Sequence, residues 1–122
     1  MTDPRHALGL RAEEAAAAWL TRQGWTVLER RWRGPGGELD LVCRDPGGTL
    51  VGVEVKLRTT GRAGVGAESV DRRRLGRLRR ALAAYAVDGG APATDLRLDL
   101  ITLDRVDDGR WRLRHLPCVD AW

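Results

Sequence analysis

Residues 37–58 read GELDLVCRDPGGTLVGVEVKLR, and this stretch decides the fold. Leu and Val alternate with other residues over 38–44 and 49–58, which is the pattern of half-buried β-strands. The Asp-Pro-Gly-Gly sequence between the two runs is typical of a tight turn, because Pro presets one backbone angle and Gly accepts angles that other residues avoid. The two runs are therefore predicted to pair as a β-hairpin.

The segments on either side of this hairpin carry helix and strand patterns. Helices are predicted over residues 8–23 and 70–87, and further strands over residues 25–31, 96–103 and 110–116. The resulting order, α-β-β-β-α-β-β, predicts an α/β fold in which helices flank a mixed β-sheet. The whole chain, residues 1–122, is predicted to be one domain, with residues 1–7 as a disordered N-terminal tail.

Length and composition exclude several classes of protein. With 122 residues, 43% hydrophobic and 31% charged, the chain suits a folded domain rather than a disordered one. Its two cysteines show no C-x-x-C spacing, which excludes a zinc ribbon and a disulfide scaffold. No apolar run approaches the roughly 18 residues of a membrane-spanning helix, and the N-terminus has no signal-peptide pattern. A cytoplasmic location, with no membrane partner, is therefore expected.

The charged residues single out one lysine. Lys and Arg together number 21 against 17 Asp and Glu, for a net charge of +4, and Lys56 is the only lysine. An ammonium is a compact point charge on a flexible stem, whereas a guanidinium is planar and stays protonated. Because the chain otherwise uses Arg wherever it needs a positive charge, Lys56 is predicted to stand where Arg does not serve. Chance is the alternative explanation.

The predicted hairpin brings acidic residues to this lysine. Side chains two apart in a strand share a face, so Glu54 and Lys56 lie on one side of their strand. In the neighbouring strand, residues 38–44, the side chains of Leu39, Leu41 and Cys43 are predicted to share the apolar face. If the apolar faces of the two strands coincide, Asp40 lies on the same side as Glu54 and Lys56.

This arrangement suits a divalent metal ion, Mg²⁺ or Mn²⁺. Such hard cations prefer oxygen ligands, which the Asp40 and Glu54 carboxylates and the Val55 carbonyl would supply. Lys56 beside them would orient a water molecule or stabilise charge that develops on a phosphate. The alternative is an ordinary exposed ion pair between Glu54 and Lys56, which contributes little.

Two motifs give the chain a family resemblance. They are Gly37-Glu38-Leu39-Asp40-Leu41-Val42 and Val53-Glu54-Val55-Lys56-Leu57-Arg58, and Arg97-Leu98-Asp99-Leu100-Ile101 follows later. With these motifs the chain resembles, over nearly its whole length, the small bacterial YraN-type proteins (UPF0102). That family is assigned to the restriction-endonuclease-like, PD-(D/E)XK nuclease fold.

The resemblance implies a role for each matching position. Asp40 and Glu54 match the metal-binding acids of the fold, and Lys56 matches its catalytic lysine. Glu13 matches the additional acidic residue that many such nucleases add to the site from their first helix. The chain departs from the family at Arg31, where asparagine is usual, and at Arg74 in the second helix, where lysine is frequent.

Basic residues indicate a nucleic-acid partner. The candidate phosphate-binding residues are Arg58, Arg72, Arg73, Arg74, Arg77 and Arg80, all but the first in the second predicted helix. A solvated helix face is the alternative for that helix. The Gly-rich residues 64–69 depart from a dinucleotide-binding loop, so no nucleotide cofactor is expected.

The function expected from these features is metal-dependent hydrolysis of phosphodiester bonds in nucleic acid, in DNA rather than RNA. One alternative is a non-catalytic nucleic-acid-binding protein that keeps the nuclease fold. Another is a protein-interaction module that docks through the basic helix. The oligomeric state is left open by the sequence.

Overall fold

The computed structural model describes residues 4–58, 72–88, 95–107, 110–117 and 119. Within them the chain forms α1 (Pro4–Arg22), β1 (Thr26–Gly34), β2 (Gly37–Arg44), β3 (Leu50–Arg58), α2 (Arg72–Asp88), β4 (Leu96–Asp107) and β5 (Arg110–Leu116). The order α-β-β-β-α-β-β is the predicted one. In this described part of the chain, no helix combines the length and the apolar character needed to cross a membrane.

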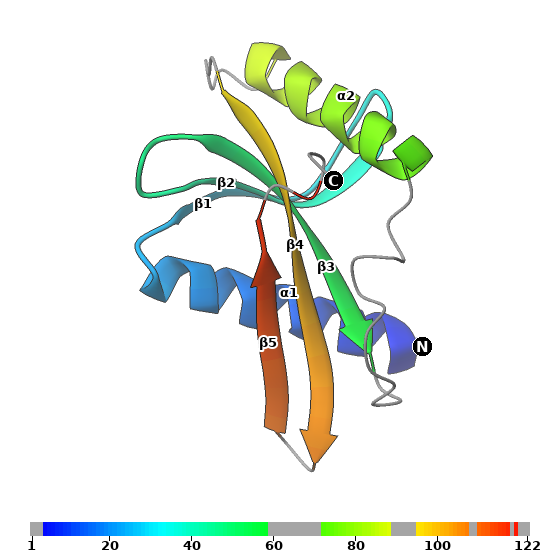
Figure 1. Cartoon of the computed structure of the whole chain (residues 1–122). Helices are drawn as coiled ribbons and strands as arrows, with labels where there is room; N and C mark the ends of the chain where they lie inside the picture. Colours follow the sequence, from blue (N-terminus) through cyan, green and yellow to red (C-terminus); the bar gives the residue numbers. More distant parts are fainter. Residues whose placement is uncertain (1–3, 59–71, 89–94, 108–109, 118, 120–122) are drawn as a thin grey trace.

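The five strands form one mixed sheet in the spatial order β1-β2-β3-β4-β5. Neighbouring strands are antiparallel except β3 and β4, which run parallel. A parallel pair needs a crossover connection, and α2 lies within that connection. Figure 1 shows α1 across one face of the sheet and α2 over the other, next to the turn between β1 and β2. This mixed sheet flanked by helices is consistent with the restriction-endonuclease-like fold.

Each face of the sheet has its own apolar core. The α1 core includes Ala12, Ala16, Ala17, Leu20, Leu41, Cys43, Val51, Val53, Ile101 and Leu103. The α2 core includes Leu39, Val42, Leu50, Leu78, Ala81, Leu82, Tyr85, Leu98, Leu100 and Val119. Because the central strands are covered on both faces, they read as almost continuous apolar runs.

Several element boundaries differ from the prediction. α1 already begins at Pro4, so the predicted disordered tail is wrong for residues 4–7. Proline is well accepted in the first turn of a helix, because its missing N–H would have no partner there. β1 extends to Gly34 and β4 to Asp107, since each continues to pair with its antiparallel partner, β4 after a register shift between Arg105 and Asp107. The Gly-rich stretch 64–69 lies outside the described residues.

The predicted apolar face of β2 is wrong at one residue. Leu41 and Cys43 lie in the α1 core, but Leu39 lies in the α2 core. The alternation breaks at Asp40, next to Arg31 of the paired strand, whose φ of 54° is in the left-handed region. A residue in this region interrupts the extended geometry of its own strand, so β1 is irregular where it runs beside the break in β2.

The turn between β1 and β2 contacts α2 at Gly36. A Cβ built on Gly36, which has a φ of 92°, would lie 2.4 Å from the carbonyl oxygen of Arg77. Backbone therefore packs directly on backbone at this point. The contact sets the distance between α2 and the β1–β2 turn, and so positions the α2 side chains near Asp40.

We expect Gly36→Ala to destabilise the protein through this contact. Gly48, in the turn between β2 and β3, also has a φ of 92° but no atom within 4 Å of its built Cβ, so Gly48→Ala is the matched control for backbone strain alone. The Gly36 variant should lose about 2 kcal/mol or more of unfolding free energy beyond the control, measured by urea denaturation. Equal losses would show that the turn does not determine the position of α2.

Candidate active site

Asp40 lies where strands β2 and β3 separate. Their ladder ends at the pair Leu41–Val53, and beyond it the Asp40 Oδ2 accepts a hydrogen bond of 2.8 Å from the backbone N–H of Val55. The carboxylate takes the place of the backbone acceptor that a longer β2 ladder would have supplied. This bond holds Asp40 against the segment of β3 that carries Glu54.

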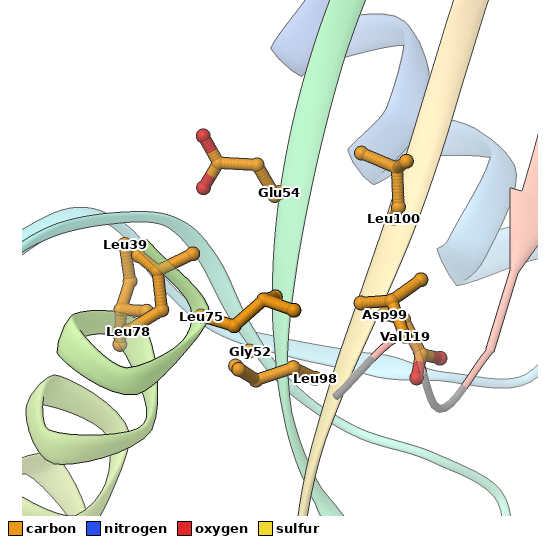
Figure 2. Close-up of a pocket in the computed structure, with 9 residues that line it drawn as sticks. All are labelled: Leu39, Gly52, Glu54, Leu75, Leu78, Leu98, Asp99, Leu100 and Val119. Carbon is orange, nitrogen blue, oxygen red and sulfur yellow. The ribbon is translucent and has the colours of Figure 1, made fainter. Parts of the chain in front are cut away.

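Glu54 projects from β3 toward α2 and is almost fully buried, with 7% of its surface exposed. Figure 2 shows its carboxylate beyond the apolar side chains of Leu39, Leu75 and Leu98, which line the same small cavity. Its Oε1 is bound by the Arg74 guanidinium of α2. Its Oε2 is buried and has no hydrogen-bond partner among the residues described. Burying a carboxylate oxygen without a partner costs free energy, so a cation or a hydrogen-bond donor bound to this oxygen would stabilise the site.

The two carboxylates interact electrostatically. Burial of the Asp40 carboxyl, and then the negative charge of Glu54, raise the pKa of Asp40 to about 7, against the lowering effect of the Val55 hydrogen bond. Glu13 of α1 raises this pKa further, and Arg74 lowers it. The structure therefore brings Asp40, Glu54 and Glu13 into one neighbourhood, in which an added positive charge would be stabilised.

Lys56 follows Glu54 by two residues on β3 and so shares its face of the sheet. Glu54 pairs with Arg74 rather than Lys56, so the simple Glu54–Lys56 ion pair does not form. Lys56 itself is half-buried. The N–H and C=O of a strand residue point toward the same neighbouring strand, so the Val55 carbonyl is directed to the side of Asp40.

Glu13 lies at the edge of this site, near the guanidinium of Arg31. The Nε of Arg31 lies 3.9 Å from a Glu13 carboxylate oxygen and 3.7 Å from one of Glu38. These distances are long for ion pairs and the side chains are partly exposed, so the contacts add little stability. Arg31 nevertheless offsets negative charge on the β1–β2 side of the site.

A cleft of about 280 Å³ opens beside Asp40, between the β1–β2 turn and α2. Asp40 and Glu38 line it on one side, and Arg74 and Arg77 on the other. In the described part of the chain, no three or more His, Cys, Asp or Glu side chains form a ready metal cluster. A metal here would have two carboxylates, a backbone oxygen and water as ligands, which suits Mg²⁺ because it keeps several waters.

The predicted phosphate-binding arginines fall into two sets. The exposed set on α2 is Arg72, Arg73, Arg77 and Arg80. The other two are engaged: Arg74 with Glu54, and Arg58 with Asp104 through bonds of 2.6 and 2.9 Å. The Arg58 side chain is only 15% exposed, so its guanidinium links β3 to β4 through Asp104 and is not presented to solvent.

Two arginines on β5, Arg112 and Arg114, join this face of the sheet without having been predicted as site residues. Strand register forms a row from Lys56 across β4 to Arg114, and pairs Arg112 with Asp104. Both arginines are exposed, and after Arg58 they help to lower the pKa of Asp104. The sequence does show this pattern, with Arg at residues 110, 112 and 114. It pointed to this face only once β4 was known to pair in parallel with β3.

A second polar cluster lies on the α1 side of the sheet. The Asp99 carboxylate accepts bonds of 2.8 and 3.0 Å from Arg97, and Nε2 of His115 lies 2.8 Å from it. The His115 ring stands edge-on to Trp19 and Trp25. These contacts satisfy a buried carboxylate and tie β4 to β5, so we regard the cluster as structural.

Comparison with known proteins identifies relatives of this chain. The model of the family described as "Uncharacterised protein family UPF0102" matches residues 12–103, which include every acidic and lysine residue of the candidate site. A UPF0102 protein of Beutenbergia cavernae is 44% identical over 115 residues, covering 94% of this chain and 97% of that protein. Those of Anaeromyxobacter dehalogenans and Deinococcus radiodurans are 40% and 41% identical, covering 96% and 86% of this chain and 86% and 87% of theirs. The chain therefore belongs to the UPF0102 family.

Proposed function

We propose that this protein is a metal-dependent nuclease that hydrolyses phosphodiester bonds in nucleic acid, with DNA as the favoured substrate. One observation carries the proposal. The buried carboxylate of Glu54 lies beside that of Asp40, its Oε2 lacks a partner among the described residues, and Lys56 follows on the same face. The ion pair with Arg74 accounts for one oxygen of Glu54 only, and a cation at the site would partner the other.

The residues present fit Mg²⁺ or Mn²⁺. The carboxylates of Asp40 and Glu54, with the Val55 carbonyl, would supply hard oxygen ligands. A cation held there would satisfy the buried Oε2 and offset the repulsion between the two carboxylates. When bound, such a cation polarises a phosphate oxygen and makes water a better nucleophile at neutral pH.

The other residues act around these ligands. Lys56 stabilises the negative charge that develops on the phosphate, or orients the attacking water, as a preorganised cation in a partly buried site. Glu13 adds negative charge from α1 and helps to hold the cation. No nucleotide cofactor has a part in this scheme.

Exposed arginines flank the site on two sides and would follow a phosphate backbone. One set lies on α2, and Arg112 and Arg114 lie on β5 across the sheet from Lys56. Arginine binds phosphate well because its planar fork matches the phosphate oxygens. A cytoplasmic location, where such a substrate is found, is part of this proposal.

A cleavage screen tests the proposed function. Single-stranded, duplex, flapped and branched DNA, with matched RNAs, are incubated with Mg²⁺ or Mn²⁺. We expect cleavage of at least one DNA structure that is lost with chelator. Salt-sensitive binding without cleavage of any substrate would favour a non-catalytic nucleic-acid-binding protein. Absence of both would favour a protein-interaction module.

The α2 arginines give a binding prediction. Replacing Arg73, Arg77 and Arg80 with Ala should weaken DNA binding about equally across sequences and make it less dependent on salt, because fewer counterions are released. The control removes as many exposed arginines from the α1 side of the sheet: Arg11, Arg22 and Arg30. Affinity is measured by fluorescence anisotropy at several salt concentrations. Equal losses in the two variants would mean that α2 contributes only net charge.

A further inference from the structure

A positive group of the chain itself already occupies the candidate metal centre. The guanidinium of Arg74 binds Oε1 of Glu54 and lines the same cleft as Asp40. It therefore contacts one of the proposed metal-binding carboxylates and lies next to the other. A divalent cation brought to these carboxylates would meet a like charge at short range, in surroundings of low dielectric constant.

The backbone beneath Arg74 is fixed, whereas its side chain can move. The next residue, Leu75, packs against the α2 core, and Leu78 lies within it. One turn along, the Arg77 carbonyl is in close contact with Gly36. The Arg74 side chain is 40% exposed, while that of Glu54 is 8% exposed. Release of Glu54 can therefore come from rotation of this long, partly exposed side chain toward solvent, without movement of the helix.

We propose that Arg74 is a resident counter-cation that a divalent metal must displace from Glu54 before the site can act. This inference rests on the proposed function and adds a mode of regulation of the same site. While the metal is absent, Arg74 compensates the buried Glu54 charge. Once displaced, its guanidinium stays at the rim of the cleft beside Arg77, where a substrate phosphate would meet it. Metal loading and phosphate binding would then favour each other through one side chain.

Direct metal titration tests this competition without relying on activity. Mn²⁺ binding is measured by calorimetry for the wild type, Arg74→Met and Arg74→Lys. Methionine keeps much of the side-chain volume without the charge, so Arg74→Met should bind Mn²⁺ about tenfold more tightly, the usual scale of coupling between sites. Arg74→Lys keeps a competing charge and should stay within a few-fold of the wild type. The control is Arg77→Met, which removes a charge from the same cleft but none that contacts Glu54.

Thermal melting of the same proteins supplies the second measurement. Without metal, Arg74→Met should melt below the wild type, because the buried Glu54 charge loses its partner. Saturating Mn²⁺ should remove most of that difference. Unchanged or weaker Mn²⁺ binding by Arg74→Met would overturn the inference, and so would an equal gain in Arg77→Met.

The two proposals fail in different ways. If the wild type binds Mn²⁺ through Asp40 but Arg74→Met binds it no better, only the role of Arg74 is refuted. If Asp40→Asn binds Mn²⁺ as well as the wild type does, the proposed metal centre is refuted, and the inference with it.

Discussion

Asp40→Asn is expected to reduce cleavage by roughly a thousandfold or more, because it removes a metal ligand and leaves Glu54 and Val55 to hold the cation. The defect should be partly relieved by raising the metal concentration, since the loss is mainly one of metal affinity. Cleavage rate as a function of Mg²⁺ concentration measures both effects. The variant should stay folded, because the amide oxygen of Asn can still accept the Val55 hydrogen bond. Retention of wild-type rates would exclude Asp40 from the metal centre.

The same substitution should raise the stability of the metal-free protein at neutral pH. The pKa of the Asp40 carboxyl is about 7 in the folded protein, mainly through burial, against an ordinary value of 3.8. A raised carboxyl pKa favours the folded state at low pH, and this contribution is lost as pH rises from about 4 to about 7. Ionisation of Asp40 should cost the wild type at most about 4 kcal/mol of unfolding free energy, at about 1.4 kcal/mol per pKa unit. Asn stays neutral, so the variant should not show this loss. Urea denaturation at pH 5 and pH 8, with chelator, measures the difference.

Replacing a residue that is needed for function but destabilises the fold is expected to lower activity and raise stability. Two observations would contradict the assignment: equal pH dependence of stability in wild type and variant, or a variant that is less stable at pH 8. The physical cause is first the burial of the Asp40 carboxyl and then the negative charge of Glu54, and a bound cation would offset that repulsion.

Lys56→Arg is the second substitution with a large expected effect. The substitution leaves the net charge unchanged, and Arg stands at all the other positions of the chain that carry Lys or Arg. If Lys56 positions water or contacts the scissile phosphate, the longer, planar guanidinium will misplace its charge. Cleavage should then fall by roughly two orders of magnitude, the scale of losing one preorganised electrostatic contact.

Metal dependence separates this defect from that of Asp40→Asn. The rate of Lys56→Arg should not recover at high Mg²⁺, because Lys56 is not a metal ligand, and Mn²⁺ affinity should be close to that of the wild type. Unfolding measurements verify that the variant is folded. Wild-type cleavage by Lys56→Arg would mean that the only lysine of the chain stands at its position by chance.

The sequence alone was enough to predict the order of elements and the hairpin. Period-two alternation places Glu54 and Lys56 on one face of a strand, because neighbouring side chains of an extended backbone point to opposite sides. The Asp-Pro-Gly-Gly turn fixes which strands pair next to each other, so β2 and β3 could be matched by local rules. These are short-range properties, each set within a few residues.

Asp40 could be assigned to the site only with a premise that failed in part. The prediction assumed unbroken alternation along β2, yet Leu39 lies in the α2 core while Leu41 lies in the α1 core. Asp40 is at the break, and its position comes from the bond to Val55 where the two strands separate. The left-handed backbone of Arg31 in β1 marks the same place, and no pattern in β2 predicts it.

The environment of the site was decided by tertiary structure alone. Arg74 read as one more arginine on a basic helix, but packing of α2 on the sheet and the contact at Gly36 direct it to Glu54, 20 residues away in sequence. Likewise Arg114 joins the face of Lys56 only because β4 pairs in parallel with β3 and antiparallel with β5. Sequence periodicity determines which side of its own element a residue occupies. Only packing between elements determines which residue it meets there, because that contact depends on the distances and register between segments that local rules do not connect.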